Sequence, residues 1–239
     1  MKKRTIWITI ISIVAVILIL AIGGMVYATR YANTIAASQQ HTATGAIKVT
    51  ETPISTHSTS TLQTFQIVPA QTTASYSVFE DLIFQNKPNN DAIGTTHSVT
   101  GSFQAQTGAS PLITGMNIKI DLRTLQSDSS MRDGHVQDAL DTSTYPYVTF
   151  VSVSTQGLPT NYTDGQTISF KLLGNLTMHG KTNGETFAVQ GKVVGNTITG
   201  TATSTIYMTD FGIQPPDLAN IAIVQNKVTI SLQFTATNS

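Results

Sequence analysis

The sequence predicts an all-β body that follows one membrane-spanning helix, and three observations support this fold class. The 239 residues include 39 threonines, which favour strands, while the helix formers glutamate and lysine are scarce. Apolar and polar residues alternate with period two through much of the second half of the chain. A single long apolar run lies near the start, at residues 6–26.

Residues 6–26 read IWITIISIVAVILILAIGGMV, and no charge lies between Arg4 and Arg30. These 21 residues at about 1.5 Å each give roughly 32 Å of helix, close to the hydrocarbon thickness of about 30 Å. Lys2, Lys3 and Arg4 precede the run, so the positive-inside rule places the N-terminus in the cytoplasm. We therefore expect residues 1–28 to be a cytoplasmic stub and signal-anchor helix of a single-pass membrane protein.

A cleaved signal peptide is the alternative, because Val26-Tyr27-Ala28 offers a small-residue cleavage site near Ala28. Its apolar core would normally be only about 7 to 15 residues long, which favours the uncleaved anchor. Both interpretations place the rest of the chain outside the cytoplasm.

Residues 29–62 are rich in Thr, Ser, Ala and Gln and show no sustained hydrophobic period. Such a segment cannot bury enough apolar surface to offset its ordering entropy. We expect a flexible linker of 34 residues, with an r.m.s. reach of about 30 to 35 Å.

Residues 63–239 form the predicted domain. Met116, Ile118 and Ile120 alternate with polar residues, as in a strand with one apolar face. Runs of this kind cover 64–68, 73–79, 99–105, 116–122, 148–153, 167–178, 187–193, 197–208 and 227–236.

Turn residues separate the runs, and Gly195-Asn196 predicts a tight hairpin. Gly174 interrupts the run 167–178 and predicts a bulge or a bend. The other predicted turns are Lys87-Pro88-Asn89-Asn90, Leu158-Pro159-Thr160-Asn161, Asp164-Gly165 and Asn183-Gly184.

One segment departs from the β pattern. Residues 128–140 have the apolar spacing of a short helix, with Asp128 or Ser129 as its N-cap and Gly134 weakening it.

Alternation alone is compatible with both a β-sandwich and a β-barrel. The long runs favour an eight-stranded antiparallel barrel around a lumen.

Five segments in order resemble the YceI-like family of lipid- and polyisoprenoid-binding proteins, over about residues 63–237. They are Phe65-x-Ile67-x-Pro69, Met131-Arg132-Asp133-Gly134-His135-Val136, Tyr145-Pro146-x-x-x-Phe150, Gly174-Asn175-Leu176-Thr177-Met178-His179-Gly180-Lys181-Thr182 and Ile206-x-x-x-Asp210-Phe211-Gly212-Ile213.

The resemblance implies an extended lipocalin-like barrel whose apolar lumen holds an isoprenoid or fatty amphiphile outside the cytoplasm. The candidate lumen residues are Phe103, Met116, Ile118, Ile120, Phe150, Phe170, Leu172, Leu176, Met178 and Phe187. Arg132, His135 and His179 are candidate head-group contacts.

For these three residues the structural alternatives are open. The sequence favours an ion pair that ties the helix to the barrel for Arg132, and local hydrogen bonds for the two histidines, over contacts with a head group. Two positions depart from the family pattern: Gln71-Thr72 replaces a frequent His-Ser, and Met208 replaces an arginine. Both changes remove polar or cationic character, which points to a less charged ligand or to binding elsewhere.

Composition narrows the function further. Thirteen cations balance thirteen anions without a basic patch, so we expect no nucleic-acid partner. The chain has no cysteine, and it has no metal, cofactor or nucleophile motif, so we expect neither a cofactor nor an enzyme. A ligand-free cell-surface β-domain remains the alternative function, and exposed strand edges would permit a homodimer.

Overall fold

The computed structural model describes residues 61–83, 85–218 and 221–238. The predicted membrane helix at 6–26 and nearly all of the predicted linker lie outside these residues. Within the described residues, no helix is both long and apolar enough to span a bilayer.

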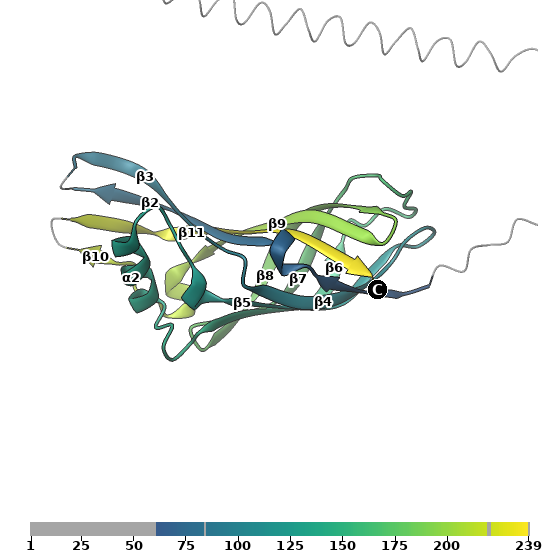
Figure 1. Ribbon diagram of the computed structural model, residues 1–239, viewed down its shortest axis with the longest axis horizontal. Helices are drawn as coiled ribbons and strands as arrows, with labels where there is room; N and C mark the ends of the chain where they lie inside the picture. Colours follow the sequence, from purple (N-terminus) through teal and green to yellow (C-terminus); the bar gives the residue numbers. More distant parts are fainter. Residues whose placement is uncertain (1–60, 84, 219–220, 239) are drawn as a thin grey trace, which may run out of the picture. The chain divides into compact units, whose positions relative to one another are not determined.

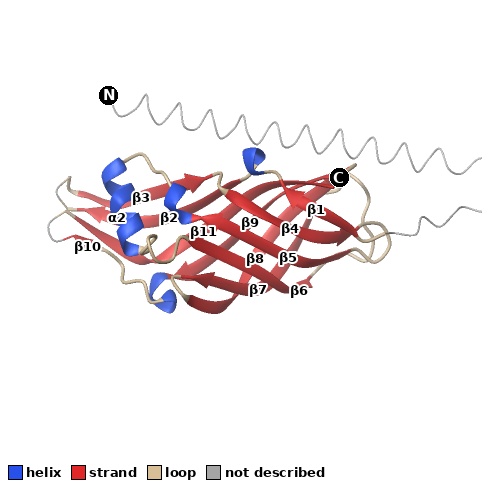
Figure 2. Ribbon diagram, turned by 60° about the horizontal axis from the view of Figure 1, so that its bottom comes forward, coloured by secondary structure: helices blue, strands red, loops and turns tan. Residues whose placement is uncertain are grey.

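Eight antiparallel strands close into a barrel, which confirms the predicted all-β architecture (Figures 1 and 2). Each strand pairs with the next in the order β1, β4, β5, β6, β7, β8, β9 and β11, and β11 returns to β1. Their bounds are β1 (Gln63–Ile67), β4 (Val99–Gln106), β5 (Leu112–Asp121), β6 (Tyr147–Gln156), β7 (Ile168–Met178), β8 (Lys181–Val194), β9 (Thr197–Tyr207) and β11 (Ala222–Asn238).

The long strand β11 gives the barrel two different ends. Its last residues pair with β1, so that β1 completes the cylinder at what we call the closed end. Its earlier residues pair instead with β2 (Thr73–Leu82), which continues into β3 (Lys87–Thr96), and the two-residue β10 (Asp217–Leu218) also joins it. Figure 1 shows β2, β3 and β10 extending beyond β1 toward the opposite end, which we call the mouth.

The single described α-helix, α2 (Ser130–Ala139), lies at the mouth (Figure 1). Its N-cap is Ser129, one of the two predicted candidates, and the Ser129 side chain accepts a hydrogen bond from the Arg132 amide. Val136 and Leu140 pack against the barrel core. Three short 3-10 helices complete the described elements: η1 (Pro69–Gln71), η2 (Leu122–Thr124) and η3 (Met208–Phe211).

Two predicted turns are wrong. Lys87-Pro88-Asn89-Asn90 begins strand β3. Proline is tolerated there because the β2–β3 register shifts between the pairs Leu82–Lys87 and Glu80–Asn90, so Pro88 lies in an irregular stretch of the ladder. Asn183-Gly184 lies inside β8, because His179 and Gly180 make the reversal four residues earlier with φ of 52° and 73°. The predicted Gly195 hairpin is confirmed, with Val194 paired to Thr197.

Gly174 lies opposite a bulge, as its position in a long strand predicted. The β6–β7 register shifts between Ser152 and Ser154, and Gly174 pairs with Ser152. A Cβ at Gly174 would overlap the Phe150 ring and the Val151 carbonyl oxygen. The glycine therefore allows β6 and β7 to approach closely where the wall bends.

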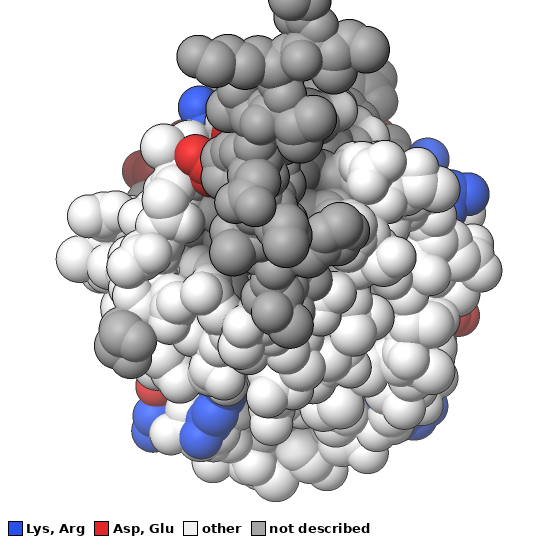
Figure 3. Space-filling model, turned by 90° about the vertical axis from the view of Figure 1, so that its right-hand side faces the viewer, with Lys and Arg blue, Asp and Glu red and all other residues white. Residues whose placement is uncertain are grey.

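Aromatic packing fills much of the closed end. The Phe65 and Phe103 rings stack with centroids 5.7 Å apart, and Phe234 meets Phe103 edge-on at 6.3 Å. All three side chains are buried. Figure 3 views the molecule from this side, where charged side chains are few among the residues coloured.

Candidate functional site

An internal cavity of about 530 Å³ occupies the mouth half of the barrel. Inward residues of β2, β5, β6, β7, β8, β9 and β11 line it, and α2 covers part of it. Solvent-exposed residues such as Lys87, Asp128 and Met131 belong to the same lining, so the cavity reaches solvent at the mouth. Its volume lies within the range of small-molecule binding sites.

A second, smaller cavity of about 70 Å³ lies toward the closed end. Both cavities are lined by Met116, Ile118, Leu172, Ala202 and Leu232. These shared residues mark a constriction between the two cavities. The apolar interior, which we call the lumen, thus consists of a larger space at the mouth and a smaller one toward the closed end.

All ten candidate lumen residues lie on this lumen. The larger cavity is lined by Met116, Ile118, Ile120, Phe150, Leu172, Leu176, Met178 and Phe187. The smaller cavity adds Phe103 and Phe170. Whether each of them contacts a ligand stays a prediction.

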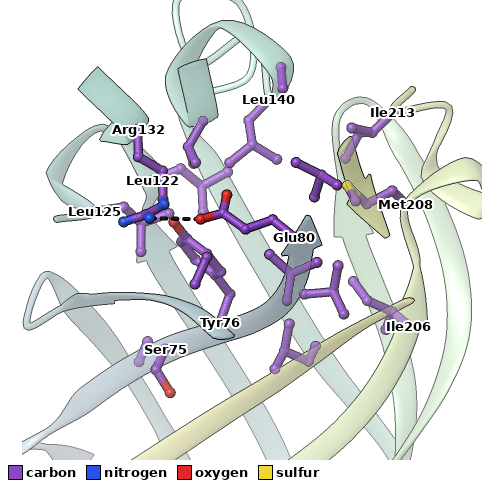
Figure 4. Close-up of a pocket in the computed structure, with 18 of the residues that line it drawn as sticks. Ser75, Tyr76, Glu80, Leu122, Leu125, Arg132, Leu140, Ile206, Met208 and Ile213 are labelled. Carbon is purple, nitrogen blue, oxygen red and sulfur yellow. Dashed lines mark hydrogen bonds and ion pairs between the residues drawn. The ribbon is translucent and has the colours of Figure 1, made fainter. Parts of the chain in front are cut away.

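Polar groups meet at the mouth, where β2 faces α2 (Figure 4). The Arg132 Nη2 donates to Glu80 Oε1 at 2.7 Å, and the side chains are only 17% and 6% exposed. Asn90 on β3 donates to the same oxygen at 2.9 Å. Arg132 Nη1 also pairs with Asp128, which is largely exposed. Arg132 thus ties α2 to the barrel wall.

Tyr76 stands on the same face of β2 as Glu80. Its ring packs over Gly94 of β3, where a Cβ would overlap it. Burial raises the pKa of Tyr76 to about 12, and the nearby Arg132 opposes this rise. The phenol therefore keeps its proton at neutral pH and offers both a donor and an acceptor to the cavity.

The two candidate histidines occupy different surroundings. His135 of α2 lines the larger cavity at the mouth. His179 lies in the β7–β8 turn, where its Nδ1 is 3.2 Å from the Phe211 carbonyl oxygen and its ring meets Tyr145 edge-on. His179 lines neither cavity. Across the described ranges, no three potential ligands from His, Asp, Glu and Cys cluster around a metal position.

Two of the residues that depart from the family pattern, Thr72 and Met208, lie in different parts of the barrel. Thr72 is fully buried away from both cavities, and its hydroxyl accepts a hydrogen bond from the Thr235 amide at 3.2 Å. Met208 lines the larger cavity and contributes an apolar side chain there (Figure 4).

Sequence reasoning missed Tyr76, Glu80 and Asn90. A signal for the first two existed, because Ala74, Tyr76, Val78 and Glu80 alternate on one face. Extending the strand expected at 73–79 by one residue would have placed a carboxylate on the inward face. Nothing local identified Asn90, since it lay in a segment that reads as a turn.

The fold and the lumen define a class of barrel proteins with an internal apolar cavity that is open at one end. The sequence matches the YceI-like domain over residues 65–236, and the chain belongs to the YceI-like family. None of the curated proteins compared with the chain matches its sequence.

Two solved structures share the fold. BcnA of Burkholderia cenocepacia is 21% identical, with 72% of this chain and 99% of that chain covered and a TM-score of 0.53. A polyisoprenoid-binding domain from Saccharophagus degradans, implicated in plant cell wall breakdown, is 14% identical, with 75% and 100% covered and a TM-score of 0.57.

Proposed function

We propose that this chain is a membrane-tethered binding protein that holds an isoprenoid or other long-chain amphiphile in its barrel lumen outside the cytoplasm. The cavity of about 530 Å³, with apolar walls and polar groups at its mouth, is the observation on which the proposal rests. Family membership and the fold shared with a polyisoprenoid-binding domain support it.

The lumen suits a slender apolar tail. Burying each CH₂ group contributes about 0.8 kcal/mol, so a long chain needs few polar contacts. The larger cavity, of about 530 Å³, lies within the range of about 300–1,000 Å³ that is typical of sites for small ligands. We therefore choose a tail of about 15 carbons with a small head group as the probe of this cavity.

The tether rests on the sequence alone. The apolar run at 6–26 would anchor the protein, and the linker at 29–62 would let the domain approach the bilayer. Protease protection of a tag placed at either terminus in intact cells tests this topology. The proposed topology requires an accessible C-terminal tag and a protected N-terminal tag.

Native mass spectrometry tests the binding function directly. The chain is purified from a bacterial host, and any co-purified molecule is extracted and identified. A stoichiometric long-chain amphiphile supports the proposal. A bare polypeptide that also takes up no added isoprenoid or fatty acid contradicts it.

A matched pair of substitutions on β9 sharpens this test. Ala202→Phe places a ring in the constriction, because Ala202 lines both cavities. Thr203→Phe places the same ring on the exposed outer face of the same strand. Ligand retention should fall at least about tenfold only in the first variant, since even a 1.4 kcal/mol penalty is tenfold in affinity. Thermal melting of both variants checks that the barrel still folds.

A further inference from the structure

The cationic group at the mouth already has its counter-charges. Arg132 reaches Glu80 through Nη2 and Asp128 through Nη1, and Nη1 also lies 3.4 Å from the Ser127 hydroxyl. A guanidinium with two carboxylate partners has little attraction left for a further anion. A phosphate or carboxylate head group would also have to approach the Glu80 carboxylate.

Glu80 itself is only partly satisfied. Its Oε1 accepts from both Arg132 and Asn90, whereas Oε2 accepts no hydrogen bond from any residue within 61–83, 85–218 and 221–238. Glu80 is 5% exposed and lines the larger cavity. Figure 4 shows its second oxygen turned away from Arg132. No fully buried side-chain oxygen or nitrogen of the described residues lacks a hydrogen-bond partner, so Oε2 is open to water, and a hydrogen-bond donor in the cavity can reach it.

The Tyr76 hydroxyl faces the same space. Figure 4 shows it directed toward the Glu80 and Arg132 side chains, and no described residue forms a hydrogen bond with it. Leu140, Met208 and Ile213 line the same cavity with apolar groups. Beside the Arg132–Glu80 pair, this region therefore offers the Glu80 Oε2 and the Tyr76 hydroxyl next to an apolar wall, and His135 and Lys87 line the same cavity.

We propose that this site prefers an amphiphile with an uncharged head group that donates a hydrogen bond, such as a hydroxyl, over one that ends in phosphate or carboxylate. Glu80 accepts the hydrogen bond from the head group, and Tyr76 contributes a second hydrogen bond. This inference rests on the proposed function, because it assumes that the lumen holds the tail.

Lys87 is the cation to weigh against the proposal. It lines the mouth, and no carboxylate within the described ranges forms a salt bridge with it. It is solvent-exposed, so salt screens its attraction for an anion. A phosphate held by Lys87 would thus bind weakly at physiological salt and would lose affinity in Lys87→Gln.

The test uses the full chain in phosphatidylcholine nanodiscs and three probes with the same 15-carbon tail: farnesol, farnesyl methyl ether and farnesyl monophosphate. Protein-bound ligand is quantified against free ligand by mass spectrometry, with empty nanodiscs as the background. Farnesol should bind at least about tenfold more tightly than either other probe, which is the lower end of what a hydrogen bond to a charged group contributes. Comparison with the methyl ether measures the contribution of the hydroxyl hydrogen bond, and comparison with the phosphate measures the effect of head-group charge.

Two variants assign the preference to residues. Glu80→Gln keeps the shape and removes the charge, so farnesol should weaken and the phosphate should gain as Arg132 loses a partner. Tyr76→Phe leaves the ion pair intact and should weaken farnesol several-fold, which keeps the test valid if Glu80→Gln unfolds. Lys171→Gln, on an exposed outer position of β7, is the charge-matched control.

The outcomes separate the two proposals. Retention of none of the three probes refutes the proposed function. Retention of the phosphate or the ether as tightly as farnesol refutes the head-group preference alone, and loss of that phosphate binding in Lys87→Gln would assign it to Lys87. A preference for farnesol that neither Glu80→Gln nor Tyr76→Phe reduces also refutes the role given to these residues.

Discussion

The two ends of the barrel use the same alternating strands for different purposes. At the closed end, Phe65, Phe103 and Phe234 from the neighbouring strands β1, β4 and β11 pack together inside the barrel, near a cavity of about 70 Å³. At the mouth, the inward residues line a space of about 530 Å³, and the Arg132–Glu80 ion pair joins helix to wall. The closed end therefore resembles a packed protein core, whereas the mouth encloses a cavity large enough for a ligand.

This difference has a structural cause. At the closed end, β1 inserts between β4 and β11 and completes a narrow cylinder. At the mouth, the β2–β3 hairpin extends the sheet from β11. The bridge Thr95–Gln126 and a hydrogen bond between the Thr96 and Thr124 hydroxyls link β3 to the segment before α2, in place of a full strand pairing. A helix laid across this wider opening cannot fill it as strand-borne phenylalanines fill the other end.

The largest expected effect breaks the packed end. Phe103→Ala should lower the free energy of unfolding by about 3–5 kcal/mol, because it removes a buried ring with two aromatic partners. Leu140→Ala at the mouth should cost only about 1–2 kcal/mol, since one side of Leu140 already faces open space. Urea denaturation measures the free energy of unfolding of both variants. Equal losses would contradict the distinction between a packed closed end and a hollow mouth.

The second prediction concerns the ion pair of the mouth. Arg132→Ala should destabilise the domain by about 3 kcal/mol, because it leaves the Glu80 carboxylate buried without its cation. Asp121→Asn breaks the outer pair with Arg123, whose side chain is 52% exposed, and should have a much smaller effect at physiological salt, because solvent and salt screen this pair. Chemical denaturation at low and high salt distinguishes the two pairs, and a loss for Arg132→Ala that salt abolishes would contradict the buried character of its pair.

The third prediction tests the bend in the barrel wall at the β6–β7 bulge, where Gly174 lies. Gly174→Ala should cost about 1–3 kcal/mol, since the new methyl group meets the Phe150 ring and the backbone of β6. Gly184→Ala on the neighbouring strand is the control, because a Cβ there meets nothing within 4 Å. Thermal unfolding of the two variants provides the comparison, and equal melting temperatures would show that the bulge yields readily.

The smallest expected effect concerns the pH dependence of stability that Glu185 of β8 contributes. Burial raises the pKa of Glu185 above its ordinary value of 4.5, and a hydrogen bond from Ser204 opposes the rise. As pH rises above 4.5, the unfolded chain loses this proton before the folded one, so ionisation of Glu185 makes stability fall with pH. Glu185→Gln should flatten that slope slightly and raise stability at pH 7. Denaturation midpoints between pH 4 and 7 measure it, and an unchanged slope would contradict the raised pKa.

Much of this architecture could be predicted from the sequence. Alternation in β5 and β7 identified the inward residues, since successive side chains of a strand point to opposite faces. The Ser129 cap and the Gly195 hairpin were readable because caps and tight turns depend on a few adjacent residues. By contrast, β3 begins with a sequence typical of a turn, and only its pairing with β2 makes it a strand.

By itself, therefore, the sequence determined the family, the eight barrel strands with β2, and the apolar faces of these strands, all of which depend on neighbouring residues or on ordered short motifs. Only the tertiary structure brought Glu80 to Arg132, across 52 positions of sequence, and left one end hollow and the other packed. The physical reason is that side-chain direction is a local property of a strand. The distance between opposite walls depends on which strands pair and where the barrel closes.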